Sequence, residues 1–254
     1  MMPATRTHYA NTILEPEEMI SSTIKVPQVW QHICYKTYPR FKQIPLKVNF
    51  LEKGKDIFSL IRDRETIRDY TKKDIPFKIL CRLIYYSCGI KSIKKINKKD
   101  IHDSAKVNRF YASGGARYPI ELYLIVNRVE GMKKGLYHYN VRDNTFELIL
   151  ERNLTKEETI INPPVNEKMK EQCSAIIILT SVLCRSEMKY LDLAYTLSFE
   201  EAGRIGDRLQ LLATNEGLGC CPVAGIYHNK LISLLNVDPE EEIPIMAHVL
   251  GNLR

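Results

Sequence analysis

The longest apolar stretch of the sequence, Ala175 to Val182, limits what this chain can fold into. Thr180 and Ser181 interrupt the stretch, and it falls far short of the roughly 20 residues that a helix needs to cross a bilayer. Its length is typical of a strand in the core of a domain. The sequence therefore predicts a buried strand here and no transmembrane helix.

The N-terminus and the cysteines indicate the cellular compartment. Residues 1–18 lack the basic-then-apolar order of a secretion signal and carry acidic residues early. The seven cysteines include no C-x-x-C pair that could clip a metal ion. They lie at Cys34, Cys81, Cys88, Cys173, Cys184, Cys220 and Cys221. We interpret them as reduced, mostly buried thiols of a cytoplasmic protein, and we expect no metal site.

The length and composition predict one large domain that can enclose a cofactor. Of the 254 residues, 44% are hydrophobic and 26% are charged, as in an ordinary globular protein with a sizeable core. Residues 1–55 have several prolines and no long period, so we expect an irregular arm packed on a main domain of residues 56–254. The lysines from Lys91 to Lys99 predict a solvated loop over residues 91–108. Without interleaved aromatic residues, they do not indicate nucleic-acid binding.

Hydrophobic periodicity predicts the remaining elements of a mixed α/β domain. Helices are expected over residues 57–64, after Asp74, over 193–216 with a stop at Gly217, and over 231–235. Strands are expected over residues 121–129, 135–141, 145–150 and 243–250, the second and third forming a hairpin.

Two arginines and a hydroxyl form the first candidate binding motif. Arg64 and Arg68 stand four residues apart with Thr66 between them, so in a helix the guanidinium groups would lie one above the other. Two guanidinium forks and a hydroxyl suit a phosphate group. The alternative is a surface helix in which Glu65 and Asp69 pair with the arginines, and the motif taken alone favours this alternative.

Two segments of small residues would let a flat ligand approach the backbone closely. The first, Ala112-Ser-Gly-Gly-Ala-Arg-Tyr-Pro119, precedes a predicted strand, and its amides could donate to a ring or a phosphate. The second, Leu218-Gly-Cys-Cys-Pro-Val-Ala-Gly225, follows the long helix. The alternatives are a plain turn into a strand and a helix C-cap with a turn. Adjacent cysteines bridge poorly, so Cys220 and Cys221 are expected to pack rather than to act in redox chemistry.

Lys189 and Tyr190 form a pair that could transfer a proton near a cofactor, provided that burial tunes their pKa values. A solvated lysine and a packing tyrosine are the alternative, and the residues alone favour it. With the phosphate motif and the small-residue segments, the pair indicates a nucleotide-like cofactor. No G-x-G-x-x-G unit or Walker A sequence is present to indicate a Rossmann or P-loop site.

Taken in order, these segments resemble the nitroreductase superfamily and, within it, the SagB-type dehydrogenases. Arg64, Thr66 and Arg68 match the family's R-x-S-x-R signature for the FMN phosphate, with Thr in place of Ser. Residues 112–119 resemble the segment P-S-A-G-A-L-Y-P, and residues 217–225 resemble a segment that contains G-L-G-T-C-P. The resemblance extends from about Tyr35 to Arg254 and includes the family's K-Y, E-A-G-H and L-Y-H-Y landmarks.

The resemblance implies an α+β fold of nitroreductase type, with a central, mostly antiparallel sheet flanked by helices, in a homodimer that binds FMN. The residues implied to hold FMN are Arg64, Thr66, Arg68, Ser113, Gly114, Gly115, Ala116, Pro222, Val223, Ala224, Gly225 and Arg254. Lys189 and Tyr190 are implied to be catalytic. The implied reaction oxidises thiazoline or oxazoline rings of a ribosomally made precursor peptide, within a synthetase that also contains a cyclodehydratase.

Several residues depart from the family pattern. Ala112 replaces a proline, Arg204 replaces the histidine after Glu-Ala-Gly, and Asp207-Arg208 stands where Gln-Asn is common. Two other functions remain open on these grounds. One is an NAD(P)H-dependent nitro or quinone reductase. The other is a flavin-free scaffold subunit of a peptide-modifying synthetase, against which the complete phosphate motif argues.

Overall fold

The computed structural model describes residues 35–48, 54–93, 107–157 and 167–254. Most of the expected arm over residues 1–55 lies outside the described residues, as do most of the clustered lysines. The boundary at residue 56 stays a prediction.

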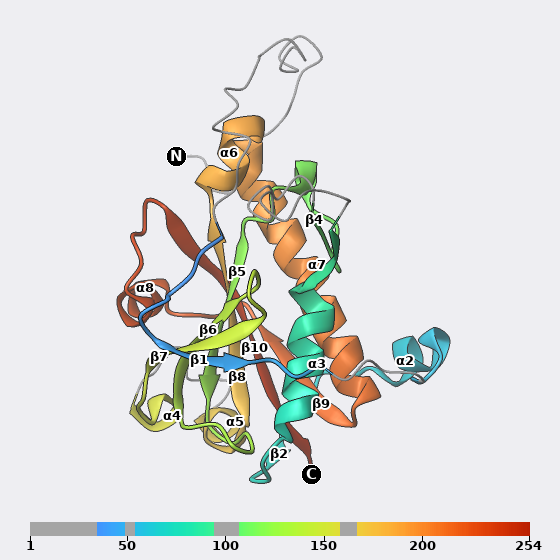
Figure 1. Ribbon diagram of the computed structural model, residues 1–254. Helices are drawn as coiled ribbons and strands as arrows, with labels where there is room; N and C mark the ends of the chain where they lie inside the picture. Colours follow the sequence, from blue (N-terminus) through green and yellow to red (C-terminus); the bar gives the residue numbers. More distant parts are fainter. Residues whose placement is uncertain (1–34, 49–53, 94–106, 158–166) are drawn as a thin grey trace, which may run out of the picture.

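An antiparallel sheet of eight strands forms the centre of the fold (Figure 1). In chain order its strands are β1 (Lys42–Pro45), β2 (Tyr70–Thr71), β5 (Ile120–Val126), β6 (Gly135–Asn140), β7 (Thr145–Leu150), β8 (Ala175–Val182), β9 (Leu218–Val223) and β10 (Glu242–Leu253). Their spatial order is β1-β7-β6-β5-β8-β10-β2, with β9 also paired to β10. The predicted hairpin over residues 135–150 is confirmed as the pair β6 and β7.

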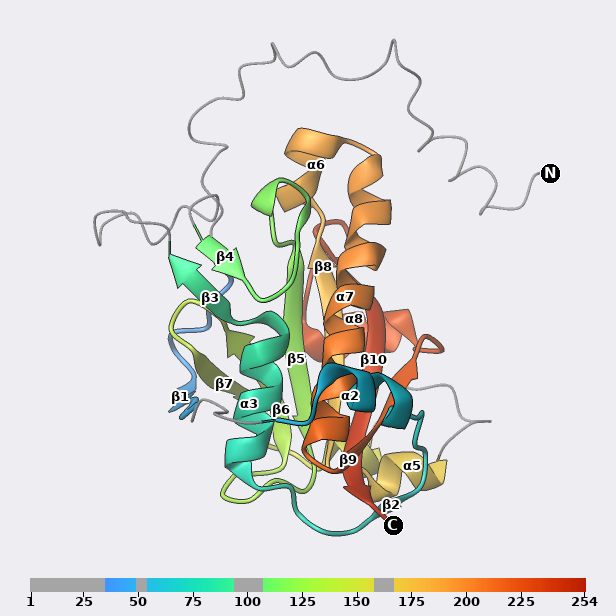
Figure 2. The ribbon, with the colours of Figure 1, turned by 90° about the vertical axis from the view of Figure 1, so that its right-hand side faces the viewer.

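Helices cover both faces of this sheet (Figure 2). In chain order, the helices of the described residues are α2 (Ile57–Asp63), α3 (Phe77–Cys88), the 3₁₀ helix η4 (Gly114–Ala116), α4 (Leu154–Glu157), α5 (Glu167–Gln172), α6 (Cys184–Tyr190), α7 (Leu193–Asn215) and α8 (His228–Leu235). The helices α3 and α7 pack on one face, whereas α4, α5 and α8 lie on the other. Helices around an antiparallel sheet make this an α+β fold, as the resemblance implied.

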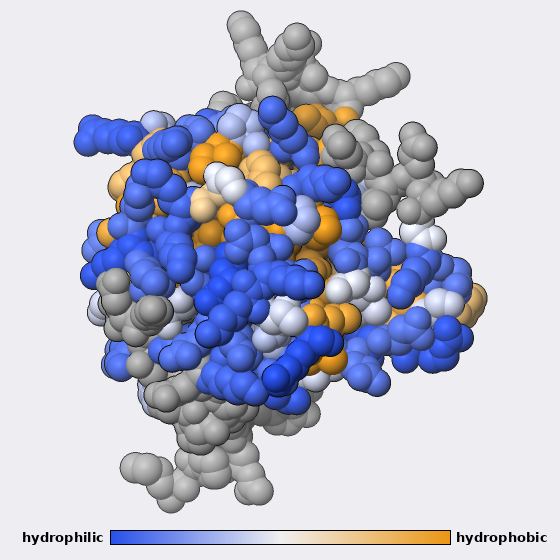
Figure 3. Space-filling view, turned by 90° about the horizontal axis from the view of Figure 1, so that it is seen from below, coloured by the Kyte–Doolittle hydropathy of each residue, from blue (hydrophilic) through white to orange (hydrophobic). Residues whose placement is uncertain are grey.

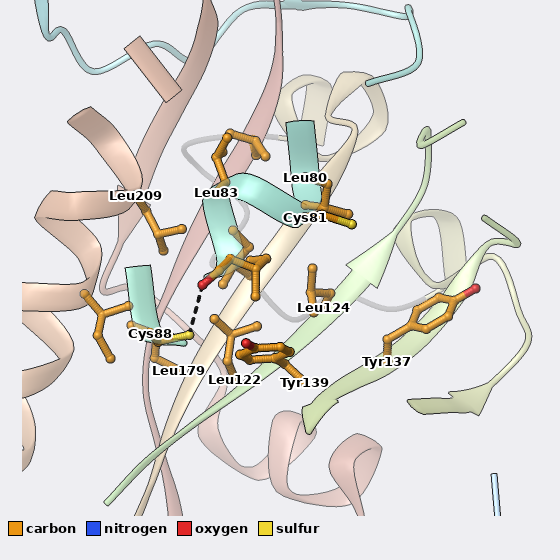
Figure 4. Close-up of a cluster of buried hydrophobic side chains, with 14 of the residues drawn as sticks. Leu80, Cys81, Leu83, Cys88, Leu122, Leu124, Tyr137, Tyr139, Leu179 and Leu209 are labelled. Carbon is orange, nitrogen blue, oxygen red and sulfur yellow. Dashed lines mark hydrogen bonds between the residues drawn. The ribbon is translucent and has the colours of Figure 1, made fainter. Parts of the chain in front are cut away.

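The apolar run from Ala175 to Val182 is confirmed as the central strand β8. It lies between β5 and β10, and its residues are buried along almost the whole strand. Because side chains alternate along a strand, Ile177 and Leu179 face the core under α3 and α7, whereas Ile176 and Ile178 face the other core. Figure 4 shows the first of these cores, where side chains of α3 meet Leu209 of α7 and residues of the sheet. A strand covered on both sides needs a continuous apolar sequence rather than an alternating one.

The long helix α7 is confirmed over nearly its full predicted range. Its buried positions include Ala202, Ile205, Leu209 and Ala213, which recur every three or four residues along one face. Gly217 follows the helix with a φ of +69°, a conformation that glycine adopts at little cost. The predicted stop therefore has its expected physical cause.

Three local segments differ in part from the interpretation of the sequence. At the two ends of the loop expected over residues 91–108, β3 (Ile90–Ile93) and β4 (Val107–Arg109) instead form a two-stranded sheet, because these segments satisfy their backbone groups by pairing with each other. Residues 94–106 of that loop lie outside the described residues. Residues 64–68 are not helical: α2 ends at Asp63, and the N–H of Ile67 donates to the carbonyl oxygen of Cys220 at 3.2 Å. Residues 218–223, interpreted as part of a loop that a ligand could approach, with a helix C-cap and turn as the alternative, form β9 because they pair with the end of β10.

The described ranges show which helices, metal-ligating side chains and cysteines this part of the chain contains. None of their helices is long and apolar enough to cross a membrane, and their side chains form no group of metal-ligating residues. Their six cysteines are free, and five of these are buried, whereas Cys184 is exposed.

Figure 3 shows that the lower end of the molecule is mostly hydrophilic, with small hydrophobic patches between the polar side chains.

Candidate active site

The glycine-rich loop and the lysine–tyrosine pair, separate motifs in the sequence, meet in the structure. Gly115 lies in η4, and Lys189 and Tyr190 end α6. A Cβ atom on Gly115 would lie 2.8 Å from Nζ of Lys189 and 2.7 Å from the hydroxyl oxygen of Tyr190. Gly115 also has a φ of +56°, which other residues rarely adopt. The absence of a side chain at this position therefore allows both polar groups to approach the loop.

The pair stands at the edge of the fold rather than in its core. Lys189 is exposed and Tyr190 is half-buried. Nζ of Lys189 lies 5.3 Å from the centre of the Tyr190 ring. A Cβ atom on Gly114 would lie 3.5 Å from that ring and 3.3 Å from Leu197 of α7. The two groups can therefore meet a ligand that approaches from solvent along the loop.

Glu201 of α7 holds the same loop from the inside. One carboxylate oxygen accepts hydrogen bonds from the Ser113 hydroxyl at 2.8 Å and from the Gly114 N–H at 3.1 Å. The other oxygen is buried and has no hydrogen-bond partner within the described part of the chain. Burial raises the pKa of Glu201 to about 7, and the two hydrogen bonds offset part of that effect. Glu201 can therefore change its protonation near neutral pH directly beneath the loop.

From the sequence, Glu201 was identified only as the first residue of the Glu-Ala-Gly landmark. A signal was available, because Ser198, Ala202 and Ile205 lie on the buried face of α7 and Glu201 falls on the same face. An acidic residue at a position where the helical period requires a small or apolar one indicates a specific partner.

The phosphate motif lies beside β9. Arg64 is half-buried and donates from Nη1 to the side-chain oxygen of Gln210 on α7 at 3.5 Å. Thr66 bridges to Cys220 through backbone hydrogen bonds, and Arg68 is exposed. An extended segment holds these side chains, so the helical condition for stacking the two guanidinium groups is not met, although the three residues still belong to one short segment beside β9.

The second small-residue segment and the C-terminus lie near this motif. Residues 222 and 223 end β9, and residues 224 and 225 follow the strand with exposed backbone. Arg254 donates to the carboxylate of Asp69 at 2.8 Å, next to Arg68 in the chain. The structure therefore gathers the arginines and β9 at one place, and the glycine-rich loop and the lysine–tyrosine pair at another.

These two clusters attach to different sides of α7. Glu201 contacts the loop, and Gln210 contacts Arg64. Nine residues separate them, which is about 14 Å of helical rise and about half a turn around the helix axis. The two clusters of one chain therefore do not face each other across a single hollow.

Comparison with known proteins identifies the family to which this chain belongs. The sequence model of the nitroreductase family matches residues 61–252. The chain belongs to the nitroreductase family. Proteins of this family typically bind FMN.

Individual relatives are distant. MJ1384 of Methanocaldococcus jannaschii, which is named as a nitroreductase, is 21% identical over 188 residues, or 74% of this chain and 86% of MJ1384. The microcin B17-processing protein McbC of Escherichia coli is 24% identical over 171 residues, or 65% of this chain and 62% of McbC. This match spans less than two thirds of McbC.

A solved structure of the E. coli microcin synthetase McbBCD complex, with truncated pro-MccB17 bound, contains a chain of the same fold. The TM-score is 0.61 at 16% identity, over 98% of this chain and 91% of that chain. At this identity the likeness shows the fold alone.

Proposed function

We propose that this protein is an FMN-dependent dehydrogenase that oxidises thiazoline or oxazoline rings of a ribosomally synthesised peptide to thiazoles or oxazoles. The observation that carries the proposal is the approach of Lys189 and Tyr190 to Gly115. Two groups that can transfer protons thus stand beside a loop that a flat ring can approach closely. The similarity to McbC, a peptide-processing protein, supports the choice of substrate.

The residues fit FMN at both of its ends. Arg64, Thr66 and Arg68 offer cationic and hydroxyl donors for a phosphate, and Arg254 would add a further cation. The small residues of segments 113–116 and 222–225, among which Gly115, Ala224 and Gly225 are exposed, suit the flat ring system. FMN, when bound, supplies a two-electron acceptor for the hydride of the substrate.

In this proposal, the protein's own side chains accept the proton that the ring releases. Oxidation of the ring removes one hydrogen as a hydride and one as a proton, and the aromaticity of the product favours the reaction. Lys189 or Tyr190, in its deprotonated form, would accept the ring proton, and the exposed position of Lys189 lets solvent take it away. Proton transfer by a positioned side chain typically contributes about 10²- to 10⁴-fold to a rate.

Two copies of the chain would complete each FMN site. The loop cluster and the arginine cluster lie on different sides of α7, so the loop of one copy and the arginines of the other would face the same cofactor in a symmetric dimer. Large apolar side chains are exposed on α2 and around the junction of α6 and α7, where a second copy would cover them. They are Ile57, Phe58, Ile61, Leu191, Tyr195 and Phe199.

The proposed partners follow from the relative. McbC is a microcin-processing protein, and the McbBCD complex was solved with a truncated pro-peptide. We therefore propose that this chain acts on an azoline-containing precursor peptide together with a cyclodehydratase.

The test is oxidation of an azoline peptide by the FMN-loaded protein under air, followed by mass spectrometry. Each ring should lose the mass of two hydrogen atoms. Lys189→Ala and Tyr190→Phe should lower turnover by about 100-fold or more and leave FMN binding unchanged. Lys230→Ala is the matched control, because Lys230 lies 5.2 Å from the Tyr227 ring in a similar exposed pair. An unchanged peptide mass with the wild-type protein would refute the proposal.

A second candidate is an NAD(P)H-dependent nitro or quinone reductase, which the match over most of MJ1384 favours. Rapid bleaching of the flavin absorbance by NAD(P)H, with turnover of a nitro compound or a quinone, would support it. Absence of flavin even after incubation with FMN would instead favour the scaffold function.

A further inference from the structure

A row of four buried charged side chains leads across the sheet to α6. Glu147 of β7, His138 of β6 and Glu121 of β5 stand on adjacent strands, and Arg185 of α6 completes the row. Nδ1 of His138 is 2.8 Å from Glu147, and Nε2 is 3.0 Å from one carboxylate oxygen of Glu121. The other oxygen of Glu121 is 2.5 Å from Arg185. All four residues are buried, so water cannot readily replace a lost partner.

The charges alternate along this row. Burial alone would lower the pKa of His138, but the hydrogen bonds with Glu121 and Glu147 raise it above its ordinary value. Burial alone would raise the pKa of Glu121, but the charge of Arg185 and the bond with His138 lower it. Each ring nitrogen of His138 faces a carboxylate oxygen, which can only accept a hydrogen bond, so the contacts of the row favour an imidazolium between two carboxylates, with the guanidinium of Arg185 beside Glu121. Removal of Glu121 would leave Arg185 without its carboxylate partner, and removal of His138 would leave Glu147 without its imidazole partner, and both remaining groups are buried.

Arg185 connects the row to the glycine-rich loop. Its Nη1 donates to the carbonyl oxygen of Tyr118 at 3.2 Å, and Nε of Arg117 donates to the carbonyl oxygen of Arg185 at 2.6 Å. The N–H of Tyr118 in turn donates to the Ser113 hydroxyl at 2.8 Å. Hydrogen bonds thus reach both ends of the loop that contains Gly115.

The helix α6 completely buries no apolar side chain of its own. It has seven residues, and helices shorter than about 12–15 residues are marginal without tertiary support. Its N-cap, Leu183, makes no side-chain cap. The buried residues of α6 are Arg185 and Ser186, and neither is apolar. Polar bonds rather than apolar burial therefore dominate the docking of this helix.

We propose that Glu121 and His138 are positioning residues for the Lys189–Tyr190 pair. Acting through Arg185, they hold α6 against the glycine-rich loop and so keep the pair beside the backbone that it faces. The catalytic role of the pair rests on the proposed function, whereas the mechanical link between the row and α6 rests only on the contacts described above.

Hydrogen exchange measured by mass spectrometry on the full-length protein tests this link without a substrate. In Glu121→Gln, the amides of residues 184–190 should exchange about tenfold faster than in the wild type, because α6 would open locally. Tyr123→Phe is the matched control. It removes a buried hydroxyl from the same face of β5, where the hydroxyl donates to Glu242 at 3.0 Å rather than to α6, so exchange in α6 should not change. Unchanged exchange in Glu121→Gln, or equal acceleration in both variants, would overturn the proposal.

A second variant keeps the test decisive if Glu121→Gln does not fold. Arg185→Lys preserves the buried charge but loses the guanidinium fork that contacts both Glu121 and Tyr118. It should accelerate exchange in residues 184–190 while the rest of β5 stays protected. Full protection of α6 in this variant would show that the row does not hold the helix.

Kinetics supply an independent readout. With an azoline peptide, Glu121→Gln and His138→Gln should lower kcat about tenfold, with KM and FMN affinity within about twofold of the wild type. Glu121→Asp should recover part of the rate. An equal loss of kcat in Tyr123→Phe would indicate general damage to the sheet and would contradict positioning. If the wild-type protein leaves azolines unchanged but α6 responds as expected in hydrogen exchange, the proposed function fails and the link stands.

Discussion

Gly206 of α7 lies against His248 of β10: a Cβ atom on Gly206 would stand 2.5 Å from Nε2 of the imidazole ring. Burial lowers the pKa of His248 to about 4, and neither ring nitrogen has a hydrogen-bond partner in the described ranges. The imidazole is therefore neutral at physiological pH and fills space beneath the helix. The missing side chain of Gly206 sets how closely α7 approaches the sheet.

Gly206→Ala should therefore lower the free energy of unfolding by about 1–3 kcal/mol, the usual cost of overpacking a core. Gly203 of the same helix is the matched control, because a Cβ atom there would meet nothing within 4 Å. Gly203→Ala should raise stability by up to about 1 kcal/mol through its better helix propensity. Urea unfolding of both variants measures the contrast. A stabilised Gly206→Ala would show that α7 can move away from His248 at little cost.

Gly115→Ala should abolish most of the turnover, whereas Gly131→Ala should not. Both glycines have a positive φ, +56° and +71°, so both substitutions introduce strain of about 1–2 kcal/mol. An added Cβ meets nothing within 4 Å at Gly131 but collides with Lys189 and Tyr190 at Gly115. Thermal melts should show comparable losses of stability, and azoline turnover should separate the two. Full activity of Gly115→Ala would mean that the pair works without this close approach.

Arg64→Ala should weaken FMN binding by about 10- to 100-fold, because a hydrogen bond to a charged group contributes about 1.5–3 kcal/mol. Arg62→Ala is the control: Arg62 is exposed near the end of α2 and bonds the adjacent Asp63 at 3.1 Å. Titration of the apoprotein with FMN, followed by flavin fluorescence, gives both dissociation constants. Equal affinities in the two variants would remove Arg64 from the proposed phosphate site.

Glu201 should make stability fall as the pH rises from about 4.5 to about 7. Its pKa is raised from the ordinary 4.5 to about 7 in the folded protein, so in this interval the unfolded chain releases a proton that the folded protein keeps. The shift corresponds to about 3 kcal/mol. Glu201→Gln has no proton to release, so its stability relative to the wild type should increase by about this amount between pH 4 and pH 8. Urea unfolding at both pH values measures the change. A constant difference between the two proteins would show that the carboxyl group does not titrate in this range.

The sequence predicted best those features whose cause is local. The unbroken apolar run from Ala175 to Val182 could be satisfied by burial on both faces, and it forms the central strand. The periodic apolar positions of α7 and the stop at Gly217 needed no information from elsewhere in the chain. The segment after α2 is extended because Ile67 bonds to Cys220, a partner far along the sequence that no local spacing could reveal.

The site shows the same division between local and long-range causes. The residue types of Lys189, Tyr190 and the arginine motif could be recognised as candidates from the sequence, but nothing local showed that the lysine and the tyrosine would meet Gly115. Glu201 was missed although the helical period of α7 places it on the buried face. The members of the row from Glu147 to Arg185 were missed because each looks like an ordinary charged residue until a strand or helix from another part of the chain buries it.

By itself, the sequence determined where the chain forms most of its central strands and its long helix, and it offered the arginine motif and the Lys189–Tyr190 pair as candidates. Only the tertiary structure decided which of these groups are neighbours, which side of α7 each cluster occupies, and which charges are buried. The physical reason is that apolar periodicity acts within one segment, whereas burial and charge pairing depend on groups that chain folding brings together from distant positions.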